Sequence, residues 1–149
     1  MTSKLMRRSV MCVTVLALVG CAQVPTSLYP EAAATFSKLK ETDGRIFVYR
    51  SSHFGGLVMP AVYLSGEQVG RAVPRQVFFV DRPAGNYDIT TATEVERKVT
   101  FTLNAGEQKY VRLAPSFGLM VGRINPELVS KVEAEKELNE LEFVLPTTK

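Results

Sequence analysis

The region from 86 to 104 constrains the fold most, because its side chains alternate with a period of two. Tyr87, Ile89 and Thr91 share one face, and Val99, Phe101 and Leu103 continue the same pattern further along. Such alternation indicates half-buried β-strand. An unbroken strand over the whole region would far exceed the usual 5 or 6 residues. We therefore expect two strands joined by a turn near 94–97.

Other segments repeat this pattern of short strands and glycine-marked turns. Strand-like runs rich in β-branched and aromatic residues occupy 45–51, 61–64 and 76–81, and turn sequences containing glycine fall at 65–66, 81–87 and 103–106. Short strands at this spacing are typical of an all-β sandwich or barrel. The sequence predicts a single mainly β domain over 44–145, a small antiparallel β-sandwich or open barrel of about seven or eight short strands.

The C-terminal segment breaks the strand pattern. Residues 133–141 combine apolar and charged side chains, and no glycine or proline interrupts them. We expect a short amphipathic helix there, packed on the sheet, and a tail over 146–149.

The N-terminus has the layout of an export signal. Lys4, Arg7 and Arg8 form a basic head, and an apolar run follows from 10 to 20. A membrane-spanning helix needs about 20 apolar residues, roughly twice the length of this run. The sequence predicts a signal peptide over 1–20 rather than a span.

The end of this run, Leu18-Val19-Gly20-Cys21, resembles the lipobox of bacterial lipoprotein signals. The resemblance implies cleavage between Gly20 and Cys21, a diacylglyceryl group on the Cys21 thiol and an acyl chain such as palmitate on the new amino terminus. Ala22 follows, where Asp would favour the inner membrane, so we expect an outer-membrane anchor facing the periplasm. The alternative is a core helix in which Cys21 is a small apolar residue.

Cleavage at Cys21 changes the composition of the remaining chain. The full chain has 18 Lys and Arg against 15 Asp and Glu, and removing the three basic residues of the signal leaves 15 against 15. A neutral chain without a basic cluster argues against nucleic acid as a partner. Cys12 leaves with the signal and Cys21 takes lipid, so we expect neither a disulfide nor a thiolate metal site.

Residues 21–43 are rich in Pro, Ala, Ser and Thr, which indicates a tether. Within it, Pro30 followed by good helix formers predicts a possible short helix over 31–40. We expect the tether to let the folded domain stand off the bilayer.

Several blocks of the domain resemble the bacterial lipoproteins grouped as domain-of-unknown-function family 2846. These blocks are "GRIFVYR", "VYLSGEQVG", "FFVDRPAGNY", "TEVERKVTFTLNAGEQKYVRL" and "SFGLMVGR". They run from Gly44 to Arg123, and the resemblance covers nearly the whole domain, to about Leu141. The resemblance implies an exported β-rich lipoprotein. It supplies no reaction and no catalytic residues.

The sequence offers little for catalysis or cofactor binding. His53 is the only histidine, so a multi-histidine metal site is excluded. If Glu94 and Glu96 lay on one extended strand, their spacing would be roughly 7 Å, near that of an inverting glycosidase pair, although a solvated polar face is the simpler interpretation. We expect no enzyme activity, no metal and no cofactor.

Two loops share an order of residues, Phe-Gly before Leu and Met: "SSHFGGLVMP" over 51–60 and "SFGLMVGR" over 116–123. One interpretation is buried strand ends. The other is an exposed apolar patch or pocket mouth for a partner, a lipid or an extended ligand. The candidate residues are Phe54, Leu57, Met59, Phe117, Leu119 and Met120.

These features favour a lipid-anchored binding or envelope-structure module, with the membrane and an envelope protein or peptidoglycan as partners. A carbohydrate- or peptidoglycan-binding module is one alternative, although the chain has no Trp for a sugar platform. A small hydrolase is a second, remote alternative.

Overall fold

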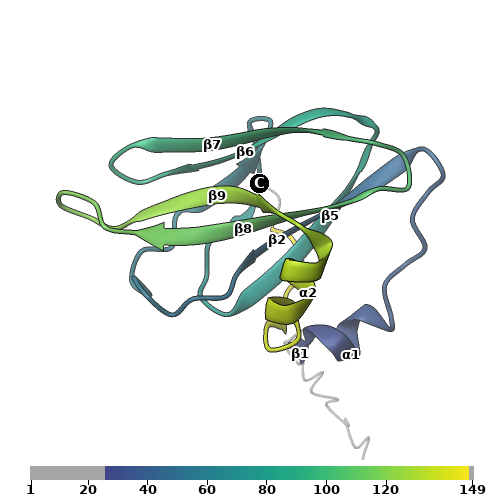
Figure 1. Cartoon of the computed structure of the whole chain (residues 1–149), viewed down its shortest axis with the longest axis horizontal. Helices are drawn as coiled ribbons and strands as arrows, with labels where there is room; N and C mark the ends of the chain where they lie inside the picture. Colours follow the sequence, from purple (N-terminus) through teal and green to yellow (C-terminus); the bar gives the residue numbers. More distant parts are fainter. Residues whose placement is uncertain (1–25, 148–149) are drawn as a thin grey trace, which may run out of the picture.

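The computed structural model describes residues 26–147, which form two β-sheets packed face to face (Figure 1). The predicted signal peptide, the lipobox with Cys21, the first residues of the predicted tether and the end of the tail lie outside the described residues. Within the described part of the chain, no helix has the length and apolar character to cross a membrane.

The larger sheet has six strands. In spatial order they are β1 (Ser27–Leu28), β10 (Glu142–Phe143), β5 (Gln76–Pro83), β2 (Asp43–Arg50), β8 (Gln108–Ser116) and β9 (Arg123–Val129). All eight residues of β2 are buried, which makes it the central strand of the fold. Two pairs are parallel, β2 with β8 and β10 with β5, whereas the sequence predicts antiparallel pairing. The β2–β8 pair arises because the chain leaves this sheet for the other one and re-enters it beside β2.

The smaller sheet has four antiparallel strands. Their order is β4 (Glu67–Arg71), β3 (Ala61–Leu64), β6 (Gly85–Ala92) and β7 (Glu96–Leu103). Ala92 pairs with Glu96, so the chain turns between β6 and β7 over 93–95. The long alternating region is therefore divided by a turn as predicted, one to two residues earlier than the predicted 94–97.

The main hydrophobic core lies between the sheets. It is formed by inward-facing side chains from both, among them Ile46, Val48, Val62, Ile89, Leu103 and Val111. The sheets do not close on one another among the described residues, so the prediction of a mainly β, sandwich-like domain is confirmed and the barrel alternative is not.

A second apolar cluster covers the outer face of the six-stranded sheet. Helix α2 (Lys131–Leu138) packs there through Ala134 and Leu138, with Leu141 beyond its end. The hydroxyl of Ser130 accepts a hydrogen bond from the Glu133 N–H at 3.2 Å and caps the helix, so α2 begins earlier than the predicted 133.

The described part of the predicted tether packs on the same face. β1 pairs with β10, and helix α1 (Tyr29–Ala33) has five residues instead of the predicted span 31–40. Beyond α1, the Phe36 ring lies 4.7 Å from that of Phe79 and 4.8 Å from that of Phe143, centroid to centroid. These aromatic rings bury the outer face of the sheet, so the chain from 27 to 36 is part of the domain rather than a free linker.

Candidate functional site: an apolar tip formed by two loops

Two loops meet at one end of the sandwich. The first connects β2 to β3 over 51–60, and the second connects β8 to β9 over 117–122. Because β2 and β8 are parallel neighbours, their chains leave the sheet at the same end. The β8–β9 loop projects beyond that end, on the left in Figure 1. We call Phe54, Leu57, Phe117, Leu119 and Met120 the apolar tip.

The side chains of the apolar tip face solvent. The exposed fractions are 97% for Leu57, 84% for Phe117, 90% for Leu119 and 92% for Met120. Phe54 is half exposed, and its ring packs edge to face on Phe117 with centroids 5.0 Å apart. These exposures correspond to the exposed-patch interpretation of the two loops rather than to buried strand ends.

Met59 is the one candidate residue that does not belong to the tip. It is half-buried, and its carbonyl oxygen accepts a hydrogen bond from Nη2 of Arg71 at 2.7 Å. The chain has already turned toward β3 at this point, so the Met59 side chain is partly covered.

A pocket of about 280 Å³ lies at the base of the tip, between the two loops. Its wall is mostly apolar and includes Phe54, Val58, Pro115, Phe117, Met120 and Ile124. The tip therefore combines projecting apolar side chains with a small apolar hollow beneath them.

Glu94 holds the β8–β9 loop in place. Its carboxylate accepts hydrogen bonds from three consecutive backbone N–H groups, those of Leu119, at 3.1 Å, Met120 and Val121. Nη2 of Arg123 lies 3.6 Å from the same carboxylate. The hydrogen bond from Val121 does most to hold the pKa of Glu94 below its usual value, and the other contacts add to it.

Gly118 makes this arrangement possible. A Cβ atom there would collide with the backbone of Val121 and would lie 2.9 Å from Oε2 of Glu94. Only glycine leaves room for the loop to close over the carboxylate.

Arg50 holds the other loop from beneath. Its side chain is fully buried at the end of β2, and its guanidinium donates four hydrogen bonds to backbone carbonyl oxygens. Nη1 donates to Val58 at 2.7 Å and to Ala72 at 2.8 Å, while Nη2 donates to Phe54 at 2.6 Å and to Gly55 at 2.9 Å. Burial lowers the pKa of Arg50, yet the group stays cationic at neutral pH, and the carbonyl dipoles compensate its charge.

The remaining candidate residues from the sequence do not assemble into a reactive site. Glu94 lies in the bend before β7, so it does not share one extended strand with Glu96 as the glycosidase-like spacing requires. The lowered pKa of Glu94 is also opposite to the shift that a general acid needs. His53 is exposed in the β2–β3 loop, and no group of three or more metal-binding side chains occurs among residues 26–147.

The polar outer face of the four-stranded sheet is a second surface with hollows. One hollow of about 390 Å³ includes Asn86, Asp88 and Thr100, and another of about 440 Å³ includes Tyr63 and Asp88. Both are open to solvent, and both polar and apolar atoms line them. Tyr63 is the one aromatic side chain in the second hollow.

Comparison with known proteins places the chain in a family. The model for a family described as "Protein of unknown function (DUF2846)" matches residues 40–123, more than half of the chain. The chain belongs to DUF2846. The matched region runs from just before β2 to the start of β9, so it contains both loops of the tip as well as Glu94.

This DUF2846 member has a distant bacterial relative. An uncharacterised protein of Haemophilus influenzae is 26% identical over 133 residues, which cover 87% of this chain and 79% of the relative. No solved structure matches the chain significantly.

Sequence reasoning identified the residues of the tip but missed the two groups that fix its shape. Glu94 binds amides 25 to 27 positions further along the chain, so no local pattern reveals its partners. Arg50 had a visible signal, since it is a charged residue that ends an otherwise apolar run, Ile46 to Tyr49, of a strand buried on both faces.

Proposed function

We propose that this protein is a lipid-anchored lipoprotein of the bacterial envelope, held in the outer membrane through Cys21, and that it acts as a binding module through the apolar tip. The anchor is supported by the export-signal pattern and the lipobox-like sequence that ends at Cys21. The exposed apolar tip is the observation that carries the binding role.

An apolar cluster of this kind is unusual on a solvent-facing loop. Single exposed apolar residues are common, but contiguous exposed patches mark interaction sites. Fully burying one Leu, Phe or Met side chain is worth about 1.5 to 3 kcal/mol. Leu57, Phe117, Leu119 and Met120 together therefore offer a substantial driving force for association.

Glu94 and Arg50, which we call the two latches because each holds the backbone of one loop, support the same conclusion. Glu94 fixes the backbone of the β8–β9 loop and Arg50 fixes the backbone of the β2–β3 loop, so the tip is held in one conformation before it meets a ligand. A preorganised surface loses less conformational entropy on binding. Neither latch contributes to the main core between the sheets, so holding the loops is their evident role.

The anchor gives this module a permanent place in the membrane. Each buried methylene of an acyl chain contributes about 0.8 kcal/mol, and two or more chains make attachment stable rather than reversible. The protein then diffuses only in the plane of the membrane, close to the molecule that the tip binds.

Replacing Phe117 and Met120 together with Ser tests the binding role of the tip. We expect the thermal stability to change little, by about 0.5 kcal/mol or less for each residue, because both side chains are solvent-exposed. We also expect the folded double variant to lose the fluorescence that the apolar dye bis-ANS gains on the wild-type protein.

A matched control removes two exposed apolar side chains elsewhere. Val132 and Leu145 are 66% and 59% exposed, and their replacement with Ser should preserve the dye signal. If Phe117→Ser with Met120→Ser instead destabilised the fold by the 2 to 5 kcal/mol typical of core truncations, the loops would be part of the core and the proposal would be wrong.

A further inference from the structure

We infer that the apolar tip inserts into the surface of the same bilayer that carries the acyl anchor, so that the domain is attached to the membrane at two points. This inference rests on the proposed function, because it requires the lipid on Cys21.

The first step is that few residues separate the proposed anchor at Cys21 from the described domain. Cys21 and Thr26 are five residues apart, and a fully extended chain of that length spans at most about 18 Å. Pairing of β1 with β10 begins at Ser27, and the following residues pack on the sheet. An acylated Cys21 therefore holds the edge of the domain near the bilayer.

The second step is the distance from this edge to the tip. Four strand-to-strand steps separate β1 from β8 in the sheet order, or about 19 Å. Ser27 lies level with Tyr49 through the pairing across β10 and β5, and Tyr49 pairs with Arg112. Ser116, at the end of β8, is four residues beyond Arg112, or about 13 Å further along the strand.

These two offsets, taken at right angles, place the base of the tip about 23 Å from the point where the chain enters the domain. With up to about 18 Å of linker, the domain can tilt until the anchor and the tip meet one plane. The tip and β1 lie at separate places on the outline of the domain in Figure 1, as two-point attachment requires.

The third step is the shape of the tip. Leu57, Leu119 and Met120 are each at least nine-tenths exposed, so they project as a convex group, and of these three only Met120 also lines the pocket at the base of the tip. Convex apolar side chains on a fixed loop suit a fluid, deformable partner, because lipid tails can surround each of them without a complementary surface.

The fourth step is the charge around the tip. Arg71 is exposed and its Nη2 donates to the carbonyl of Met59, next to the β2–β3 loop. Arg97, which is half-buried, follows the exposed Glu96 at the start of β7 beside the same end. None of Arg71, Arg97 and Glu96 has an ion-pair partner among residues 26–147. The carboxylate of Glu94 is already taken up by three amides and Arg123. With Arg71 and Arg97 against Glu96, this end keeps a net positive charge behind the apolar group, which matches the anionic headgroups of a bilayer.

The absence of Trp from the chain provides a direct test. The variant Phe117→Trp places a single indole on the tip of the full-length, acylated protein, which is reconstituted into vesicles of phosphatidylethanolamine and phosphatidylglycerol with brominated acyl chains. We expect a blue-shifted emission that the bromine atoms quench.

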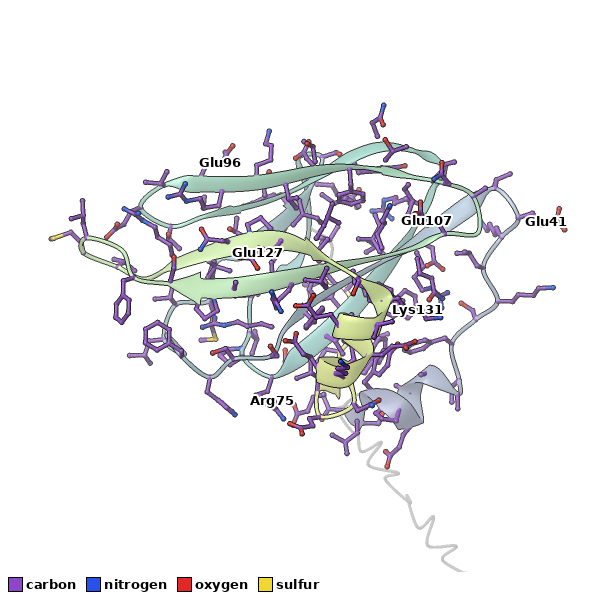
Figure 2. All side chains as sticks on the ribbon, viewed as in Figure 1. Glu41, Arg75, Glu96, Glu107, Glu127 and Lys131 are labelled. Atoms are coloured by element: carbon purple, nitrogen blue, oxygen red, sulfur yellow. The ribbon has the colours of Figure 1, made fainter. Side chains whose placement is uncertain are left out.

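The control variant is Ala105→Trp. Ala105 is exposed in the turn between β7 and β8, two residues before Glu107, which Figure 2 shows at the end of the domain opposite the β8–β9 loop. Its emission should stay that of a solvated indole and should not be quenched in the same vesicles.

The outcomes separate this inference from the proposed function. A mass that includes the acyl groups, together with an unquenched indole at position 117, would overturn the inference and leave the anchor intact. A blue shift that bromine does not quench would mean that the indole at position 117 packs against protein instead of lipid. That result would overturn the inference as well. Absence of acyl groups from the chain would overturn both.

Discussion

Glu94 and Arg50 carry charges of opposite sign, and each of them fixes the backbone of one loop of the apolar tip. Glu94 gathers the N–H groups of one loop, and Arg50 gathers the carbonyl oxygens of the other. Hydrogen bonds to charged groups are stronger than neutral ones, so a single side chain can fix several residues of backbone. Each loop of the apolar tip therefore depends on one residue.

Glu94→Gln tests this dependence in the β8–β9 loop. An amide group offers one acceptor oxygen in place of two charged ones, so we expect the amides of Leu119, Met120 and Val121 to exchange their hydrogens faster at neutral pH. Amide hydrogen exchange followed by NMR measures this directly. Glu96→Gln is the matched control, since Glu96 has no such contacts, and equal protection in both variants would contradict the latch.

The same latch predicts a dependence on pH. The folded pKa of Glu94 is lower than its unfolded value, so its contribution to the loop is complete above the ordinary carboxyl range and is lost as the pH falls through the lower, folded pKa. Near neutral pH the Glu94 carboxylate is therefore ionised and keeps its hydrogen bonds to the β8–β9 loop.

At this scale the sequence revealed which residues form the tip and little about what holds them. Phe54, Leu57, Phe117, Leu119 and Met120 stand out because both loops repeat Phe-Gly before Leu and Met. Exposure could not be decided from the pattern, since an apolar loop suits a core or a surface equally well. The position of the β8–β9 loop is fixed by the long-range hydrogen bonds from its amides to Glu94, and these depend on how the sheets pack.

Among the elements, the segment from β1 to Phe36 departs most from the sequence prediction. Its composition indicates a linker, yet its two aromatic residues, Tyr29 and Phe36, pack on Phe47. Composition indicates how soluble a segment is on average. It does not show that the outer face of β2 and β5 is apolar and is buried by this segment. The strands themselves were predictable from alternation and glycine turns, whereas the parallel pairing of β2 with β8 requires knowledge of which sheet each strand joins.

Phe36→Ala tests whether this segment belongs to the domain. The ring is half-buried among four aromatic neighbours, so we expect a loss of about 2 to 3 kcal/mol, at or just below the low end of measured Phe→Ala effects. Urea unfolding measures the change. Phe117→Ala is the control and should change stability by about 0.5 kcal/mol or less. A free tether would give an equally small value for Phe36→Ala.

At the scale of the whole molecule, the packed N-terminal segment determines how far the domain can lie from the proposed anchor. A tether of residues 21–43 would let the domain range freely, whereas strand pairing in the described part of the chain begins at Ser27, six residues after Cys21. In the proposed arrangement, the domain is held near the bilayer with its apolar tip at one end. We propose that the anchor and the tip together make a membrane-associated binding module, and the anchor is the part on which the rest depends.

The most direct test of this account is the intact mass of the full-length gene product recovered from its native envelope. We predict a chain that begins at Cys21 and carries a diacylglyceryl group and an amide-linked acyl chain. We also predict that Cys21→Ser abolishes acylation and leaves uncleaved or mislocalised precursor. A wild-type chain that retains residues 1–20, or a Cys21→Ser variant with normal membrane retention, would contradict the account.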